Sequence, residues 1–322
     1  MRELAEAFLI DASRHKGGSE LCVAHRINGV TKWFQGDYIA ARSHLEQAVS
    51  IYDPERDRDL AYRFGQDIGV SAMVYLALVL WPLGEVARAR KLIEAGLRLA
   101  IEQGHVHTNA YGYGYKVIFE TIRRDPARAI PELHDLLGIT NKYGLQLFEI
   151  AGTFLLSWAR WHVDGEAGSA VMQRCLAVLA QQRYSVFWPV MHTLLAEVEA
   201  GEGRVEAGLQ ILDDQLVEIE RTAHHAFDVE LHRMRGELLQ RNGHGTKAAA
   251  EAAFIRAIDI ARQQQTRTFE LRATFSLAQL YHSTGRHQAA RDLLIPALRS
   301  FNDPVEVPEV FRAQRLLSIE SS

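Results

Sequence analysis

Glycine recurs along this chain of 322 residues, each time at the end of one periodic apolar segment and the start of the next. The intervals between these glycines are 48, 81, 38, 40 and 42 residues, and Arg124 stands near the middle of the interval of 81. A repeat of about 40 residues is typical of stacked helical hairpins, because each hairpin can bury its apolar face only against its neighbours. The glycines concerned are Gly36, Gly84, Gly165, Gly203, Gly243 and Gly285.

The segment 278–297 carries the repeat most clearly. Ala278, Tyr281 and Gly285 are spaced i, i+3 and i+7, which is one face of a helix that ends at a breaker. A second helix repeats the spacing from Ala290 onward. Small residues at these positions let two helix backbones approach closely. The pattern occurs seven times and strand signals are missing, so the sequence predicts seven helical hairpins.

This skeleton resembles the tetratricopeptide repeat over nearly the whole chain, from about Glu20 to Phe301. The period here is longer than the 34 residues of that repeat, which lengthens both helices. Segments 52–67 and 262–273 are similar to the C-terminal repeat region of large bacterial regulators. Those regulators join a class III nucleotide cyclase or a DNA-binding domain to an ATPase and a repeat array.

The resemblance implies an all-α fold, a right-handed superhelical solenoid of about seven tetratricopeptide-like hairpins with a flanking helix at each end. We expect residues 1–18 to form the helix of a truncated repeat. Residues 19–303 would form the repeat array, and residues 304–322 a capping helix with its polar side toward water.

Composition narrows the classes of partner. The formal net charge is −4, and lysine and arginine are scattered, so direct nucleic-acid binding is not expected. A run of about 18 uncharged apolar residues, which a membrane span would need, is missing. Cys22 and Cys175 have apolar neighbours and are interpreted as buried thiols. We therefore expect a cytoplasmic protein.

The motifs of an enzyme are also missing. Residues 243–247 share glycine, threonine and lysine with a phosphate-binding loop but not its spacing, and are interpreted as a turn. His224, Asp228 and His232 are spaced i, i+4 and i+8, which predicts that they lie on one helix face. Zinc would need further ligands that the neighbouring sequence does not supply, so solvated polar residues are the preferred interpretation. We expect no catalysis, no metal and no cofactor.

In repeats of this class the first helix of each hairpin lines a concave groove, and the resemblance places that groove on specific residues here. The run Tyr111–Tyr115 also contains two glycines and is interpreted as close helix packing, with an aromatic ligand platform as the alternative. The predicted groove residues are Arg26, Trp33, Asp67, Trp81, Tyr111, Tyr115, His162, Glu230, Arg233, Glu237, Arg272, Gln279 and His282.

We therefore predict a scaffold that docks a protein or peptide partner, such as a cyclase, ATPase or DNA-binding domain. Apolar anchors would come from the first half of the groove and arginine–glutamate pairs from the second. The alternative is a sensor of a small effector, which a deep aromatic pocket closed by Tyr111, Trp158 and Trp188 would favour. Because exposed ion pairs contribute little to stability, reversing Arg233 and Arg272 is expected to leave the fold intact.

Overall fold

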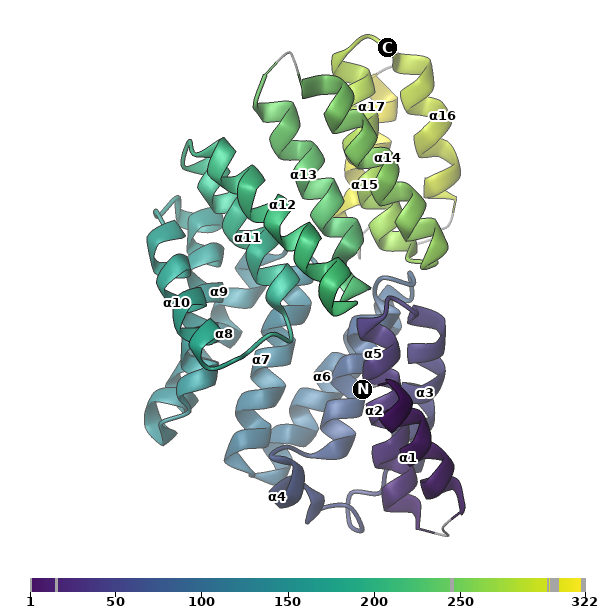
Figure 1. The fold of residues 1–322 in the computed structure, drawn as a ribbon, viewed down its shortest axis with the longest axis vertical. Coiled ribbons are helices and arrows are strands. Elements are labelled where there is room, and N and C mark those ends of the chain that lie inside the picture. The colour runs from purple at the N-terminus through teal and green to yellow at the C-terminus, as the bar shows by residue number, and fades with distance from the viewer. Residues whose placement is uncertain (1, 15–16, 244–245, 300, 302–306, 320–322) are drawn as a thin grey trace. The chain divides into compact units, whose positions relative to one another are not determined.

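A computed structural model describes residues 2–14, 17–243, 246–299, 301 and 307–319. All regular secondary structure in these residues is helical (Figure 1). The predicted all-α fold class is confirmed. The handedness of a superhelix stays a prediction, as do the domain bounds at residues 18 and 303.

Across the described ranges, the helices follow one another in seven pairs joined by short connections, with a single helix before the first pair and another after the last. The flanking helices are α1 (Arg2–Arg14) and α17 (Pro308–Ile319). The pairs are α2 (Gly18–Phe34) with α3 (Tyr38–Ile51), α5 (Ile68–Leu80) with α6 (Val86–Gln103), α7 (Val106–Ile122) with α8 (Pro126–Tyr143), α9 (Gln146–Asp164) with α10 (Ser169–Gln181), α11 (Trp188–Gly201) with α12 (Val205–Thr222), α13 (Asp228–Arg241) with α14 (Lys247–Gln263), and α15 (Arg267–Ser283) with α16 (His287–Leu298). Short helix α4 (Leu60–Phe64) lies between the first two pairs, and a 3₁₀ turn (His225–Phe227) precedes α13.

The glycine spacing predicted the turns inside the hairpins. All six repeat glycines have positive φ, from 71° at Gly165 to 120° at Gly243. Residues with a Cβ adopt this left-handed conformation at a cost, which explains the choice of glycine. Arg124, which stands where the seventh glycine would be, also has a positive φ of 63°. The repeat therefore keeps its turn geometry even where it loses its glycine.

Short side chains at the helix starts fix where several second helices begin. The Asp37 carboxylate accepts a hydrogen bond from the Ala40 amide at 3.0 Å and caps α3. Asp125 accepts from the Arg128 amide at 3.2 Å, and Pro126 opens α8 at its first position. Both arrangements satisfy amide groups that the first helical turn leaves without a partner.

Small residues mark the places where helices approach most closely. A Cβ added to Gly29 would come within 2.5 Å of Leu45 on the partner helix. A Cβ on Gly208 would come within 2.6 Å of the Ala196 carbonyl oxygen. Ala278, like Ala196, is completely buried. The predicted role of these small residues in helix packing is confirmed.

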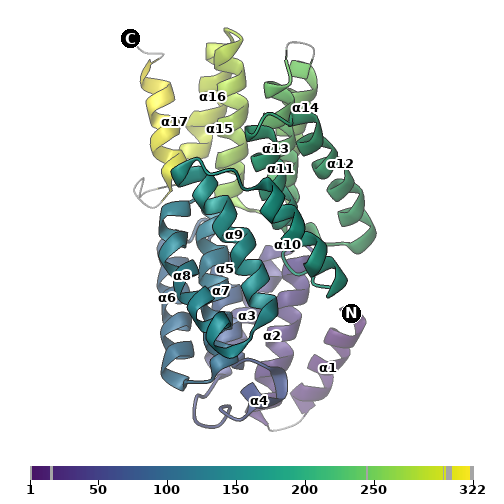
Figure 2. The same ribbon diagram turned by 90° about the vertical axis from the view of Figure 1, so that its left-hand side faces the viewer.

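The chain divides into two compact units, which are described separately. The first comprises residues 1–79 and 88–191, and the second comprises residues 80–87 and 192–322. Part of the core of the first unit lies where Cys22 on α2 packs with Ala48 and Ile68, and Cys22 is a free thiol. In the second unit, α15, α16 and α17 lie side by side (Figure 2) and bury Ala278, Ala290, Leu294 and Ala313.

Candidate partner-binding site

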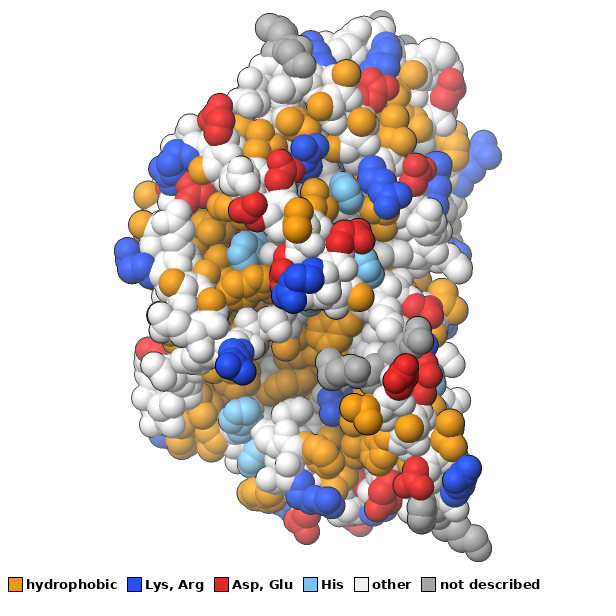
Figure 3. Space-filling model, in the orientation of Figure 1, with side chains coloured by type: hydrophobic (Ala, Val, Ile, Leu, Met, Phe, Trp, Pro, Cys, Tyr) orange, Lys and Arg blue, Asp and Glu red, His pale blue; other side chains and the backbone are white. Residues whose placement is uncertain are grey.

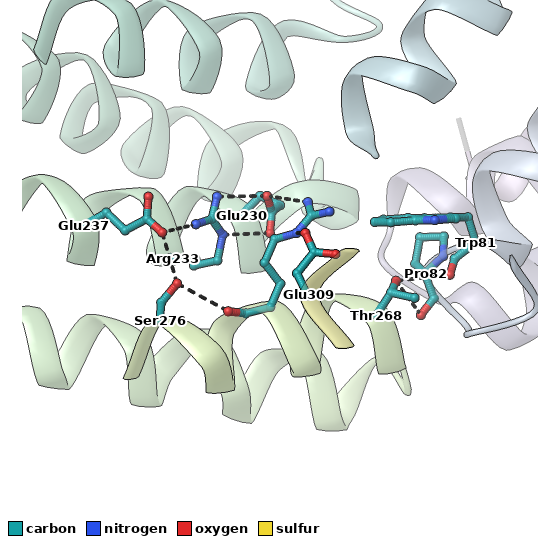
Figure 4. Close-up of polar contacts among 9 residues, drawn as sticks. Trp81, Pro82, Glu230, Arg233, Glu237, Thr268, Ser276 and Glu309 are labelled. Atoms are coloured by element: carbon teal, nitrogen blue, oxygen red, sulfur yellow. Dashed lines mark hydrogen bonds and ion pairs between the residues drawn. The ribbon is translucent and has the colours of Figure 1, made fainter. Parts of the chain in front are cut away.

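A buried network of charges joins three helices of the second unit (Figure 4). Glu230 on α13 accepts hydrogen bonds from Arg233 Nε at 3.0 Å and from Arg272 Nη1 on α15 at 3.1 Å. The Arg272 Nε donates to Glu309 on α17 at 2.9 Å. Arg233 also pairs with Glu237, which accepts from Ser276 Oγ at 3.0 Å. The network thus ties the first helices of two successive hairpins to the C-terminal flanking helix.

Arg233 and Arg272 are both buried, because each is only 4% exposed. Both nevertheless keep their charge. Burial alone would lower the pKa of Arg272, but the carboxylates of Glu309 and Glu230 raise it. The pKa of Arg233 is raised in the same way, by Glu230 and Glu237 against the effect of burial. These pairs are part of the interior of the second unit.

The turn at residues 80–87 packs against the same end of α15. Trp81 lies beneath the Arg272 guanidinium, 5.1 Å from ring centroid to Cζ, and makes an edge contact with Phe269. Thr268 donates from its hydroxyl to the Trp81 carbonyl and from its amide to the Pro82 carbonyl, both at 3.0 Å. Trp81 is therefore a buried anchor of the second unit, with its ring covered by charge and aromatic contacts.

Next to the network, α13 and α15 line an open pocket of about 420 Å³. Its lining residues are Glu237, Gln240 and Arg241 from the C-terminal half of α13, and Ser276 and Gln279 from α15. Gln279 and Arg241 are exposed, whereas Ser276 is buried at the base. Amide, guanidinium, carboxylate and hydroxyl groups all converge here, so the pocket offers both donors and acceptors to a polar ligand.

The structure places most of the predicted groove residues inside the protein. Exposed members are His162 and Gln279, and partly exposed members are Arg26, Glu237 and His282. The buried members are Trp33, Asp67, Trp81, Tyr111, Tyr115, Glu230, Arg233 and Arg272. The expectation that Arg233 and Arg272 form solvated surface pairs is therefore wrong, because each is enclosed by carboxylates from neighbouring helices.

The first unit brings a second set of predicted residues together. Tyr111 and Tyr115 on α7 stack at 4.3 Å, and the Tyr115 hydroxyl donates to Tyr75 on α5 at 2.6 Å. Trp33 and Phe187 make edge contacts with these rings. The aromatic cluster thus contains Tyr111, but Trp158 packs elsewhere, against His162 and Arg124. Aromatic pairs of this kind stabilise a core beyond the area they bury.

Several other predicted positions have local structural roles. Asp67 accepts from the Val70 amide at 2.8 Å and from the Tyr52 hydroxyl at 2.9 Å, so it holds the first turn of α5. His162 lies against Trp158 and Trp161, and His282 lies 3.0 Å from His287 between ring nitrogens. The His162 contacts lie within α9, and the His282–His287 contact joins α15 to α16.

The three polar residues at 224, 228 and 232 do not share one helix face. His224 precedes the 3₁₀ turn, and α13 begins only at Asp228, which binds His225 at 2.8 Å. In the described part of the chain, no group of three or more histidine, cysteine or carboxylate side chains could hold a metal ion.

None of the described helices is long and apolar enough to cross a membrane.

Some residues of both clusters escaped the sequence prediction. Ser71 and Tyr75 lie four and eight residues after Asp67, and Ser276 lies four residues after Arg272. That helical spacing was the available signal, since each side chain repeats the face of a predicted neighbour. Glu309 carried no such signal, because its partner Arg272 lies 37 residues away.

Comparison with known proteins agrees with this architecture. Residues 271–294 match the model of the tetratricopeptide repeat. An uncharacterized protein of Rhizobium meliloti (strain 1021) is 23% identical over 253 residues, which is 78% of this chain and 24% of that protein. The chain thus spans about a quarter of the length of the curated relative it matches.

Two solved structures share the fold. A Rap protein complexed with competence and sporulation factor has a TM-score of 0.63 at 10% identity, with 99% of this chain and 81% of that chain covered. The apo form of RapI has a TM-score of 0.52 at 11% identity, with 92% and 98% covered. At these identities the likeness concerns the fold alone. The chain is therefore a tetratricopeptide-like array of helical hairpins.

Proposed function

We propose that the chain is a non-catalytic interaction module that docks a protein or peptide partner on α13 and α15. The pocket between these helices is the single observation that carries this proposal. It combines Glu237 and Gln279, two residues that the repeat pattern selected, with Arg241 and Gln240. Side-chain amides can bind the backbone of an extended peptide, and Arg241 can pair with a partner carboxylate.

The buried network sets which groups remain for a partner. Arg233 and Arg272 are enclosed by Glu230, Glu237 and Glu309 and have a structural task. The partner would contact the outer rim instead, at Gln240, Arg241 and Gln279. A polar segment with at least one acidic side chain fits that rim better than an apolar helix. A Rap protein of similar fold is complexed with competence and sporulation factor, which agrees with a binding task for this fold.

Photo-crosslinking tests the proposal in cells, where the partner is present at its natural concentration. A photoreactive phenylalanine analogue is placed at Gln279 in the pocket, and at the exposed Arg98 on α6 as a control. We expect a covalent protein adduct from the Gln279 position in cells of the source organism and not from the Arg98 position. The same adducts from both positions, or none from Gln279, would contradict docking at this pocket.

An effector-sensing role is the second candidate. The aromatic cluster of the first unit favours it, although Trp158 packs against His162 and Arg124 instead. The cluster lies beside a partly buried cation, Arg26, and therefore combines aromatic rings with a positive charge.

A further inference from the structure

Arg26 on α2 is a partly buried cation without a counter-ion among the described residues. Its Nη1 donates one long hydrogen bond, 3.4 Å, to Ser71 Oγ on α5, and its buried Nε has no hydrogen-bond partner. No carboxylate of the described chain lies within ion-pair distance of it. A charge withdrawn from water without a counter-ion is costly. The arrangement therefore calls for an anion that the chain itself does not supply.

The groups around Arg26 are hydrogen-bond donors. Ser71 Oγ lies 3.1 Å from the Tyr111 hydroxyl, which continues the polar path from the guanidinium into the aromatic cluster. Burial raises the pKa of Tyr111, so this phenol keeps its proton at neutral pH. Guanidinium and hydroxyl donors together suit a carboxylate.

Aromatic rings lie next to the polar groups Arg26, Ser71 and Tyr111. Tyr75, Tyr111 and Tyr115 come from α5 and α7, and Phe187 comes from the connection between α10 and α11. Figure 3 shows hydrophobic side chains gathered in places on this face of the molecule. A flat or apolar ligand body would contact these rings, as in most small-molecule sites.

We propose that the first unit binds a small aromatic carboxylate, with the carboxylate on Arg26, Ser71 and the hydroxyl of Tyr111. The ligand ring would lie against the tyrosine cluster. Asp67, at the start of α5, does not replace the ligand, because its oxygens already accept from the Val70 amide, the Tyr52 hydroxyl and the Gln103 amide. This site belongs to the first unit and is independent of the docking pocket on α13 and α15.

Titration calorimetry with phenylacetate and indole-3-acetate as probes tests the site. Phenylacetamide keeps the ring but removes the charge, and acetate keeps the charge but removes the ring. We expect at least one aromatic carboxylate to bind, with phenylacetamide and acetate each binding more weakly. Arg26→Gln should weaken binding roughly tenfold or more, the loss of one charge-assisted pair. Tyr111→Phe should weaken it by a smaller factor, because one hydroxyl donor is lost.

Arg98→Gln is the matched control, since Arg98 is an exposed arginine of the same unit, and it should bind like the wild type. Melting curves establish that each variant is folded. Arg26→Gln should melt no lower than the wild type without ligand, because it removes an unpaired charge. Equal binding by Arg26→Gln, equal binding of phenylacetamide and phenylacetate, or no binding of either aromatic carboxylate to wild type would overturn the proposal.

Discussion

Arg272 on α15 and Glu309 on α17 form a buried ion pair, 2.9 Å between Nε and Oε1, although 37 residues separate them. Glu230 on α13 contacts the same guanidinium at 3.1 Å. One arginine thus holds two carboxylates from two other helices. Removing either member of such a pair is strongly destabilising, because the remaining charge stays buried without its partner.

Arg272→Ala should therefore lower the free energy of unfolding by about 3–5 kcal/mol, the usual cost of breaking a buried pair. Urea denaturation followed by circular dichroism measures this change. Arg98→Ala, at an exposed arginine, should change the unfolding free energy by less than about 0.5 kcal/mol. If Arg272→Ala unfolds at the same urea concentration as Arg98→Ala, the buried network does not contribute to the stability of the protein.

Two helical glycines provide a matched pair for the packing argument. A Cβ at Gly236 on α13 would come within 2.5 Å of the Phe254 ring on α14, whereas a Cβ at Gly138 on α8 would meet nothing within 4 Å. Gly236→Ala should destabilise the protein by about 1–3 kcal/mol through overpacking. Gly138→Ala should stabilise it by about 0.5–1 kcal/mol, because alanine loses less entropy in a helix. Thermal unfolding of both variants distinguishes these signs, and equal shifts would contradict the close approach of α13 and α14.

Arg124 offers a test of the turn geometry. Its φ of 63° is a strained backbone conformation for a residue with a Cβ. The contact of its guanidinium with Trp158, 5.5 Å from Cζ to the ring centroid, partly offsets this strain. Arg124→Gly and Arg124→Ala both lose that contact, but only glycine adopts the left-handed conformation freely. The glycine variant should be more stable than the alanine variant by about 1 kcal/mol. Chemical denaturation measures the difference, and a more stable alanine variant would refute the assigned turn.

His232 is expected to make the free energy of unfolding depend on pH in the acid range. Burial, with the nearby charges of Arg256 and Arg235, lowers the pKa of His232 from 6.5 to about 4. Between pH 6.5 and 4 the unfolded chain binds a proton at this position while the folded protein does not. Stability is therefore lost as the pH falls through this window, by up to about 3 kcal/mol.

His232→Gln should remove this share, so that its unfolding free energy falls less between pH 7 and pH 4.5 than that of the wild type. His134→Gln, at an exposed histidine, is the control. Denaturant titrations at a series of pH values give both slopes. A pH dependence of His232→Gln that matches the wild type would show that His232 titrates normally in the folded protein.

The helical architecture could be predicted from the sequence because it depends on local patterns. Gly285 and its equivalents require a left-handed turn, and Ala278 requires a close neighbour, wherever the rest of the chain lies. Such requirements repeat at an interval of about 40 residues, so seven weak signals support one another. Even the exception, Arg124, could be located from the sequence, because the interval of 81 residues is about two repeats long.

The candidate site could be predicted only in part, because burial depends on distant residues. Helical spacing selected Arg233 and Arg272 as an inner face, but not Glu309, whose helix encloses Arg272. Without that partner the arginines looked like solvated groups. Likewise the spacing of Tyr111 and Tyr115 indicated a shared face but not that Tyr75 and Phe187 would surround it.

Titration of the crosslinked partner against wild type, Arg241→Glu and Arg98→Glu tests the central claim most directly. Arg241 is an exposed residue of the pocket rim and Arg98 is an exposed arginine outside it, so both reversals change the net charge equally. We predict that Arg241→Glu weakens binding roughly tenfold or more, while Arg98→Glu binds like the wild type and both melt like it. Equal affinities for the two variants would contradict docking of the partner on α13 and α15.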